Sequence, residues 1–159
     1  MAIQDILTEL AKATSIEKRA VSNPAVLNEA FDYPKPSSFS RGIRLEFGNV
    51  VVILISGTAS IDERGVSIHT GDFRAQCQRV FSNIEGLLAQ EGATWKDVVR
   101  TGCFLRDMER DYAAFNEERT RYFKEQGVDL LPASIGIQVV LCRSELLVEM
   151  EAMAVLVKK

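Results

Sequence analysis

Two carboxylates interrupt an apolar run near the end of the chain, in the stretch Leu147-Val148-Glu149-Met150-Glu151-Ala152-Met153-Ala154. Side chains of a strand alternate between its two faces, so every second residue from Val148 to Ala154 contributes to one continuous apolar face. Glu149 and Glu151 share the other face, about 7 Å apart along the strand. Two like charges at that separation raise the pKa of one carboxyl unless a cation, a donor or water compensates. The pair therefore marks either a solvated outer face of a sheet or a functional cleft, and both interpretations stay open.

The run before it, residues 131–142, also alternates like a strand. One of its faces is continuously apolar, made by Ile135, Ile137, Val139 and Leu141. If residues 143–146 form the turn of a hairpin, Gln138 and Val140 lie opposite the two glutamates and on the same face. The two strands would then line a shallow polar groove. An arrangement in which the two strands are not neighbours is the alternative.

Length and charge limit the function classes. With 159 residues, 47% of them hydrophobic and 26% charged, the chain has the composition of one ordinary globular domain. A formal charge of −3 argues against a nucleic-acid partner, because affinity for phosphates comes mainly from Lys and Arg. No run approaches the ~18 apolar residues of a membrane span. Asp5 and Glu9 interrupt the apolar residues of the N-terminus, so we expect no secretory leader and no membrane partner.

The three cysteines are typical of a reducing compartment, and we expect a cytoplasmic protein. Cys77 falls in a helical apolar series, whereas Cys103 and Cys142 fall in predicted strands, so all three are interpreted as free buried thiols. There is no C-x-x-C spacing, and one histidine cannot build a typical zinc site. We therefore expect no metal and no cofactor.

The remainder of the chain alternates between strand and helix patterns. Hydrophobic periodicity predicts strands over residues 16–21, 41–47, 50–61 and 98–106, with a hairpin turn at Gly48-Asn49. It predicts helices over 73–90, with Asp72 as N-cap, over 109–126, and at Ile3, Ile6, Leu7 and Leu10. Residues 23–38 hold three of the four prolines and are expected to form a long irregular segment. This order predicts an α+β (mixed α/β) fold, with two helices packed on one face of a single sheet.

The motifs, taken together and in order, resemble the Rid family, also called YjgF-like or L-PSP proteins. They are Ile55-Ser56-Gly57-Thr58-Ala59, Gly71-Asp72 with Gln76 and Asn83-Ile84, Val98-Val99-Arg100-Thr101, Phe104-Leu105-Arg106-Asp107, Phe115-Asn116-Glu117, Pro132-Ala133 and Val148-Glu149-Met150-Glu151-Ala152. No single piece is specific, but the ordered set is. The resemblance divides the single domain 1–159 into a family core, 39–155, and an N-terminal extension, 1–38.

The resemblance implies a chorismate-mutase-like sheet and a barrel-like homotrimer with three small-molecule clefts between its subunits. Characterised members hydrolyse reactive enamines and imines, such as 2-aminoacrylate and its imine, to 2-oxo acids and ammonia. The expected partners are therefore a small carboxylate ligand and further copies of the chain. Glu149 matches the glutamate that orients the hydrolytic water, and Phe39 matches a tyrosine that lines the cleft.

This chain departs from the family where the substrate carboxylate is held. Active members carry Pro-Ala-Arg-Ser, whose arginine makes a bidentate contact with the carboxylate, and here the aligned residue is Ser134. A serine offers one neutral donor in place of a charged fork. The Cys or Thr that is common two places further on is Gly136. The candidate site thus keeps its water-positioning half and lacks its anion-holding half.

Two other arginines are candidates to replace the missing cation. Arg41 follows Phe39 and Ser40, and Arg143 follows the strand that carries Ser134, so both belong to segments expected to form the cleft. The alternative is that each is a solvated surface arginine, as most arginines are. The segments 56–72 and 141–149 also resemble the Rid-like part of chorismatases, which act on a dicarboxylate with an enol ether.

Two further polar features have ordinary structural explanations. His69 is a candidate general base because histidine is the usual residue in that role, but a lone histidine in a loop before a helix cap is usually only solvated. Ser56-Gly57-Thr58 lacks the glycine pattern and partners of a nucleophile elbow.

Three functions stay open: an imine or enamine hydrolase, a chorismatase-like enol-ether hydrolase, and a non-catalytic trimer that binds a metabolite or a protein. An endoribonuclease ranks last, because of the charge and the missing histidine pair.

Overall fold

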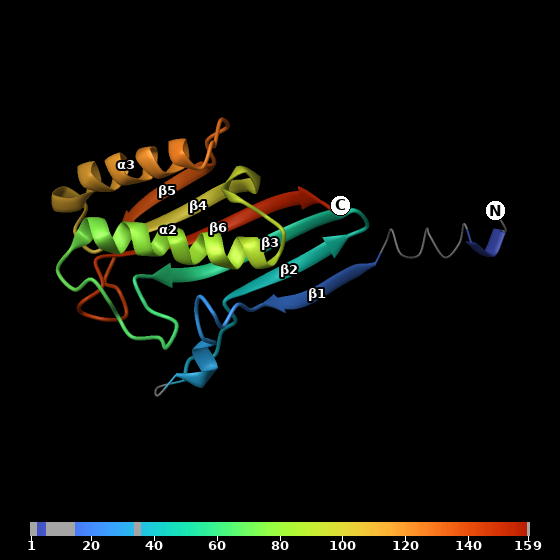
Figure 1. Cartoon of the computed structure of the whole chain (residues 1–159), viewed down its shortest axis with the longest axis horizontal. Helices are drawn as coiled ribbons and strands as arrows, with labels where there is room; N and C mark the ends of the chain where they lie inside the picture. Colours follow the sequence, from blue (N-terminus) through green and yellow to red (C-terminus); the bar gives the residue numbers. More distant parts are fainter. Residues whose placement is uncertain (1–2, 6–14, 34–35, 159) are drawn as a thin grey trace.

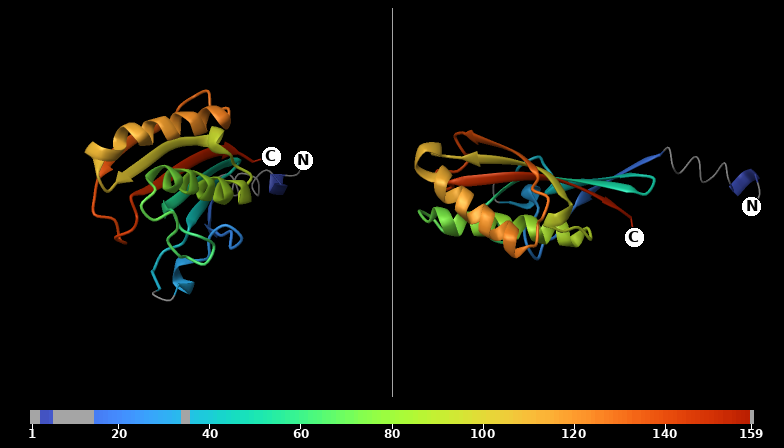
Figure 2. Two further views of the ribbon diagram at one scale, coloured as in Figure 1. Left: turned by 60° about the vertical axis from the view of Figure 1, so that its left-hand side comes forward. Right: turned by 90° about the horizontal axis from the view of Figure 1, so that it is seen from above.

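The computed structural model describes residues 3–5, 15–33 and 36–158. Six strands form one sheet in the order β1-β2-β3-β6-β4-β5, and α2 and α3 lie on the same face of it (Figures 1 and 2). The strands are β1 (Ile16–Val21), β2 (Gly42–Phe47), β3 (Val50–Ala59), β4 (Val98–Leu105), β5 (Ala133–Gln138) and β6 (Val148–Val157). The helices are α2 (Phe73–Gln90) and α3 (Met108–Glu125), with 3-10 turns η1 (Ala30–Asp32) and η2 (Trp95–Asp97). The expected α+β class is confirmed.

The element boundaries follow from local chemistry. The Asp72 side chain accepts a hydrogen bond from the Ala75 amide, which caps α2, and Asp107 caps α3 in the same way through the Arg110 amide. Gly92 and Gly127 follow the two helix ends with positive φ. The predicted hairpin at Gly48-Asn49 is confirmed by the antiparallel pairing of β2 with β3.

The core lies between the helices and the sheet. One side of α2 is fully buried, through Cys77, Val80, Phe81, Ile84, Leu87 and Leu88. It packs against the buried face of the Glu149 strand, formed by Val148, Met150, Ala152 and Ala154 as the alternation predicted. Since none of the described helices combines the length and the apolarity that a bilayer crossing requires, no membrane span is found among them.

The segment between β1 and β2 packs on the core of its own chain. Leu27 and Ala30 are fully buried, and the Asn23 amide donates a hydrogen bond to the Gly86 carbonyl of α2. A β-carbon at Gly86 would collide with Val26, so glycine at this position lets the segment approach the helix. The predicted N-terminal helix is described only over residues 3–5, and its Ile6, Leu7 and Leu10 lie outside the described residues.

In the C-terminal part, the structure has the non-adjacent arrangement of the two left open, and one cysteine was wrongly predicted to be buried. Strands β5 and β6 do not form a hairpin, because β4 lies between them, parallel to β5 and antiparallel to β6. Helix α3 makes the crossover that a parallel pair requires. Cys142 lies in the loop between β5 and β6 and is exposed, whereas Cys77 and Cys103 are buried thiols as expected.

Candidate functional site

The sheet face that the helices do not cover is mainly apolar, and we call it the open face. All six strands contribute half-buried or exposed side chains to it, among them Ile16, Ile43, Leu45, Val52, Leu54, Phe104, Ile135, Ile137, Met153 and Val155. Glu149 and Glu151 are on this face, opposite the buried side of β6. The two carboxylates thus lie in an apolar surface of the subunit rather than on a solvated polar one.

Glycines on the neighbouring strands make room for both carboxylates. A β-carbon at Gly57 of β3 would collide with Oε1 of Glu149, and one at Gly102 of β4 would stand 2.6 Å from Oε1 of Glu151. Gly57 belongs to the irregularity between Ile55 and Thr58, where the pairing of β3 with β6 shifts. The Glu149 carboxylate therefore lies directly over a bulge in the adjacent strand.

The surroundings of Glu149 favour its protonated form. Burial raises the pKa of its carboxyl above the ordinary value, and the nearby charge of Glu151 raises this pKa further. Within residues 3–5, 15–33 and 36–158, no group donates a hydrogen bond to this carboxylate and no cation pairs with it. A half-buried carboxyl with a raised pKa and free oxygens is suited to accept and return a proton.

This environment predicts that Glu149→Gln stabilises the folded protein at neutral pH. A raised folded pKa means that the stability contributed by Glu149 is present below the ordinary glutamate pKa and is lost as pH rises through the folded pKa. Glutamine cannot ionise, so the variant should have a melting temperature higher by a few degrees at pH 7 and an unchanged one near pH 4. Thermal melts of both proteins across this range test the sign, with exposed Glu17→Gln as control. A variant less stable at pH 7 would contradict the prediction.

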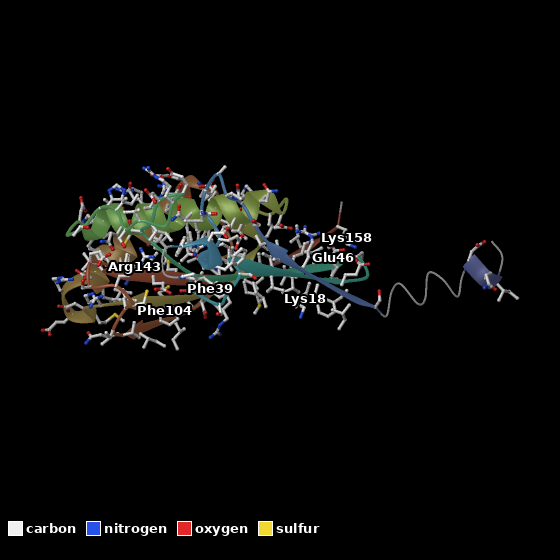
Figure 3. The ribbon with its side chains drawn as sticks, turned by 90° about the horizontal axis from the view of Figure 1, so that it is seen from below. Lys18, Phe39, Glu46, Phe104, Arg143 and Lys158 are labelled. Carbon is white, nitrogen blue, oxygen red and sulfur yellow. The ribbon has the colours of Figure 1, made fainter. Side chains whose placement is uncertain are left out.

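Residues 39–41 run beside the bulge under Glu149. The Ser56 hydroxyl donates to the Ser40 carbonyl at 2.7 Å, and the Ser56 amide donates to the Arg41 carbonyl at 3.0 Å. Phe39 is 41% exposed and lies at the same end of the molecule as Phe104 and Arg143 (Figure 3). Phe104 is also the cross-strand partner of Glu149. Ser40 is thus bonded to the residue that precedes Gly57, over which Glu149 lies, and Phe39 is the residue before Ser40.

Both arginines proposed to replace the missing cation donate hydrogen bonds to other groups of their own chain. Arg41 is only 2% exposed, so the alternative of a solvated surface arginine is wrong for it. Its Nε and Nη2 donate to the Asn28 carbonyl at 2.9 and 2.7 Å, and its guanidinium lies 4.9 Å from the Tyr33 ring centroid. Arg143 donates through Nη1 to the Gly65 carbonyl and the Ser67 hydroxyl. These bonds connect irregular segments around the sheet, which is a structural task for both side chains.

The structure places Ser134 and Gly136 on the opposite side of the sheet from Glu149. Ser134 pairs with Thr101 of β4 and its hydroxyl accepts from the Thr101 hydroxyl at 3.1 Å, on the helix-covered face. Gly136 is close to Met108 and Tyr112 of α3. Gln138, expected opposite the glutamates, accepts from the Met108 amide on the same side. The shared polar groove predicted from a hairpin is therefore absent within one chain.

One charged residue near Ser134 was not recognised from the sequence. Arg119 of α3 donates through Nη1 to the Ser134 hydroxyl at 3.0 Å and through Nη2 to Asn116 Oδ1 at 2.7 Å. Its position in an aromatic stripe of the helix, four residues after Phe115, was the available indication. His69 lies in the turn before α2, exposed and with a φ of 60°, as a loop residue was expected to. Across the described ranges, no three His, Cys, Asp or Glu side chains are grouped to hold a metal ion.

Comparison with known proteins identifies the family. The family model described as endoribonuclease L-PSP matches residues 25–156. This chain belongs to that family, the Rid or YjgF-like proteins. A RutC family protein of Pyrococcus abyssi is 35% identical over 122 residues, which is 76% of this chain and 89% of that protein. A RutC family protein of Haemophilus influenzae is 31% identical over 111 residues, 70% of this chain and 82% of that protein.

Solved structures of the family have the same fold. A structure described as a putative endoribonuclease from Thermotoga maritima is 27% identical, with a TM-score of 0.70 over 90% of this chain and 99% of that one. The YjgF gene product of E. coli is 22% identical, with a TM-score of 0.70 over 89% and 99% of the two chains. The E. coli protein TdcF, solved with bound serine, has 19% identity and a TM-score of 0.70 over 89% and 99%.

Proposed function

We propose that this protein is a trimeric enzyme that binds a small carboxylate metabolite in clefts between subunits and hydrolyses reactive enamines or imines to 2-oxo acids and ammonia. The observation that carries the proposal is the Glu149 carboxylate, which lies over Gly57 on the open face with a raised pKa and no partner among the described groups. Family membership supports the same conclusion, because this glutamate matches the water-orienting residue of active members.

The chemistry needs one group that moves protons at the reacting carbon. In the proposed reaction, the Glu149 carboxylate takes a proton from water as the water oxygen bonds to the imine carbon. Glu149 returns that proton to the nitrogen, which gives a neutral carbinolamine. The carboxylate then takes the proton of the new hydroxyl and passes it to the same nitrogen as the C–N bond breaks, which releases ammonia and leaves a carbonyl. One imine and one water thus give one 2-oxo acid and one ammonia. A carboxyl whose pKa is raised by burial and by a neighbouring carboxylate is suited to take up and return these protons.

The clefts must combine two subunits if Glu149 and the Ser134 region act together. Glu149 is on the open face, whereas Ser134 is on the helix-covered face of the edge strand β5. The open face carries apolar side chains on all six strands, and a mainly apolar sheet face of this extent needs a cover in water. A ring in which the β5 edge of one subunit meets the open face of the next supplies that cover and joins the two halves.

The assembly is expected to be a trimer that depends on the open face. Light scattering at micromolar concentration should give three times the mass of one chain. Leu54→Asp places a charge in the middle of the open face and should shift the mass to that of a monomer. Val66→Asp, at an exposed loop position, is the matched control and should leave the trimer intact. A wild-type monomer would contradict the prediction.

The activity is tested with 2-aminoacrylate generated in the cuvette by a serine-eliminating enzyme. The protein should accelerate the appearance of pyruvate and ammonia over the uncatalysed hydrolysis and should lower the fraction of intermediate trapped by semicarbazide. Rates equal to the uncatalysed reaction would leave the second candidate, a trimer that binds carboxylates without turnover. That candidate is favoured by one observation, the neutral Ser134 at the position of the family arginine.

A further inference from the structure

Arg119 is held in place by uncharged groups. Its two terminal nitrogens donate to Ser134 Oγ and Asn116 Oδ1 at 3.0 and 2.7 Å, and its guanidinium lies 5.0 Å from the Phe115 ring centroid. Neutral acceptors orient a guanidinium without cancelling its charge. The side chain is therefore fixed before any ligand arrives, which lowers the entropic cost of binding one.

The other arginines on the same helix are differently used. Arg110 is paired with Asp111 at 2.6 Å, and Arg121 is paired with Glu118. Arg119 is the arginine of α3 for which no carboxylate partner is found among the described residues. Its Nη1 donates to Ser134 Oγ and, at 3.9 Å, to Cys103 Sγ, whereas Nη2 donates only to Asn116 Oδ1, so Nε and one hydrogen of Nη2 are left for a bidentate contact with an anion.

Arg119 also lines a cavity of about 420 Å³ beside the edge strand. The wall is apolar over Phe123, Val128, Leu131 and Pro132, and the polar groups are contributed by Arg119, Lys124, Asp129 and Ser134, among others. A largely apolar pocket with a few convergent polar groups is the usual form of a small-molecule site. This pocket is large enough to admit a small 2-oxo acid, and Arg119 is a cation in its lining.

We propose that Arg119 binds the substrate carboxylate, from α3 instead of from the strand. The inference rests on the proposed function, and it names the cation that this function requires. The guanidinium donates a hydrogen bond to the hydroxyl of Ser134. Ser134 stands at the sequence position where active family members have their arginine. The Ser134 side chain is small and leaves the space that Arg119 occupies. Arg119 of the helix therefore takes the place of the arginine that active members carry on the strand.

The test is binding of pyruvate to the purified full-length protein by isothermal titration calorimetry, with neutral pyruvamide as the comparison ligand. Wild type should prefer pyruvate. Arg119→Gln keeps an amide that can bond with Asn116 and Ser134 but loses the charge, so it should bind pyruvate at least about tenfold more weakly and pyruvamide unchanged. Arg121→Ala, on the same helix and paired with Glu118, is the control and should bind both ligands like wild type.

A restoring variant guards against effects on folding. Arg119→Gln combined with Ser134→Arg returns a guanidinium to the pocket from the strand and should recover most of the pyruvate affinity. If wild type prefers pyruvate and Arg119→Gln keeps that preference, the inference is overturned while the proposed function survives. If wild type shows no preference for the charged ligand, both are overturned.

Discussion

Glu149→Gln is expected to lower the rate of imine hydrolysis about a hundredfold while pyruvate affinity changes little. Glutamine keeps the shape and a hydrogen-bonding group over Gly57 but cannot take a proton from water. The loss should therefore appear in kcat, and pyruvate binding through Arg119 should stay intact. Steady-state rates with 2-aminoacrylate, measured beside calorimetric pyruvate binding, separate the two effects.

The matched control is the neighbouring carboxylate. Glu151 contributes to the raised pKa of Glu149, so Glu151→Gln should lower that pKa and shift the ascending limb of the pH–rate profile to lower pH without a comparable loss of the maximal rate. A Glu149→Gln enzyme with wild-type turnover would refute the assigned role. Equal losses in both variants would instead point to a general effect of charge on the open face.

Local patterns were sufficient to predict most of the fold. The apolar series of α2, the cap at Asp72 and the alternation of β6 are set by neighbours in sequence, and the structure confirms each of them. These features depend on side-chain periodicity and helix-end hydrogen bonds, which are the same in any tertiary context.

Strand order was not predictable in the same way. A loop of nine residues, 139–147, separates β5 from β6 and is short enough for a hairpin, yet β4 lies between the two strands. The insertion depends on α3 crossing over the sheet, which brings β4 and β5 into parallel pairing. The hairpin alternative would have placed Ser134 and Gly136 on the same face as Glu149, and the choice could not be made from the sequence because face assignments between strands need the true pairing.

The arginines illustrate a second limit. Exposure of a long charged side chain depends on tertiary contacts, so the sequence could not reveal that Arg41 is buried against Tyr33 and the Asn28 carbonyl. Arg119 was visible as one member of an aromatic stripe. Its hydrogen bond with Ser134 links α3 to β5, and these two elements are neighbours only because α3 crosses over the sheet.

Two impaired variants are expected to restore activity to each other when they share a trimer. If a cleft takes Glu149 from one subunit and Arg119 from the next, a mixed trimer of Glu149→Gln and Arg119→Gln contains some clefts with both native residues. Around the ring of any mixed trimer, whether two to one or one to two, one cleft in three is intact, so purified mixed trimers should reach about a third of wild-type turnover. Each variant alone should stay near a hundredth of wild type for Glu149→Gln and a tenth or less for Arg119→Gln.

The experiment uses co-expression with two different affinity tags, so that only mixed trimers survive sequential purification. The control pair is Glu149→Gln with Glu149→Gln, carried through the same two tags, in which no cleft regains the glutamate. Recovery beyond the mean of the two parents requires that the site be built from two subunits, because a site within one chain would stay damaged in every protomer. An activity equal to that mean would place the whole site in one chain, and the opposite faces of Glu149 and Ser134 would then exclude their joint action.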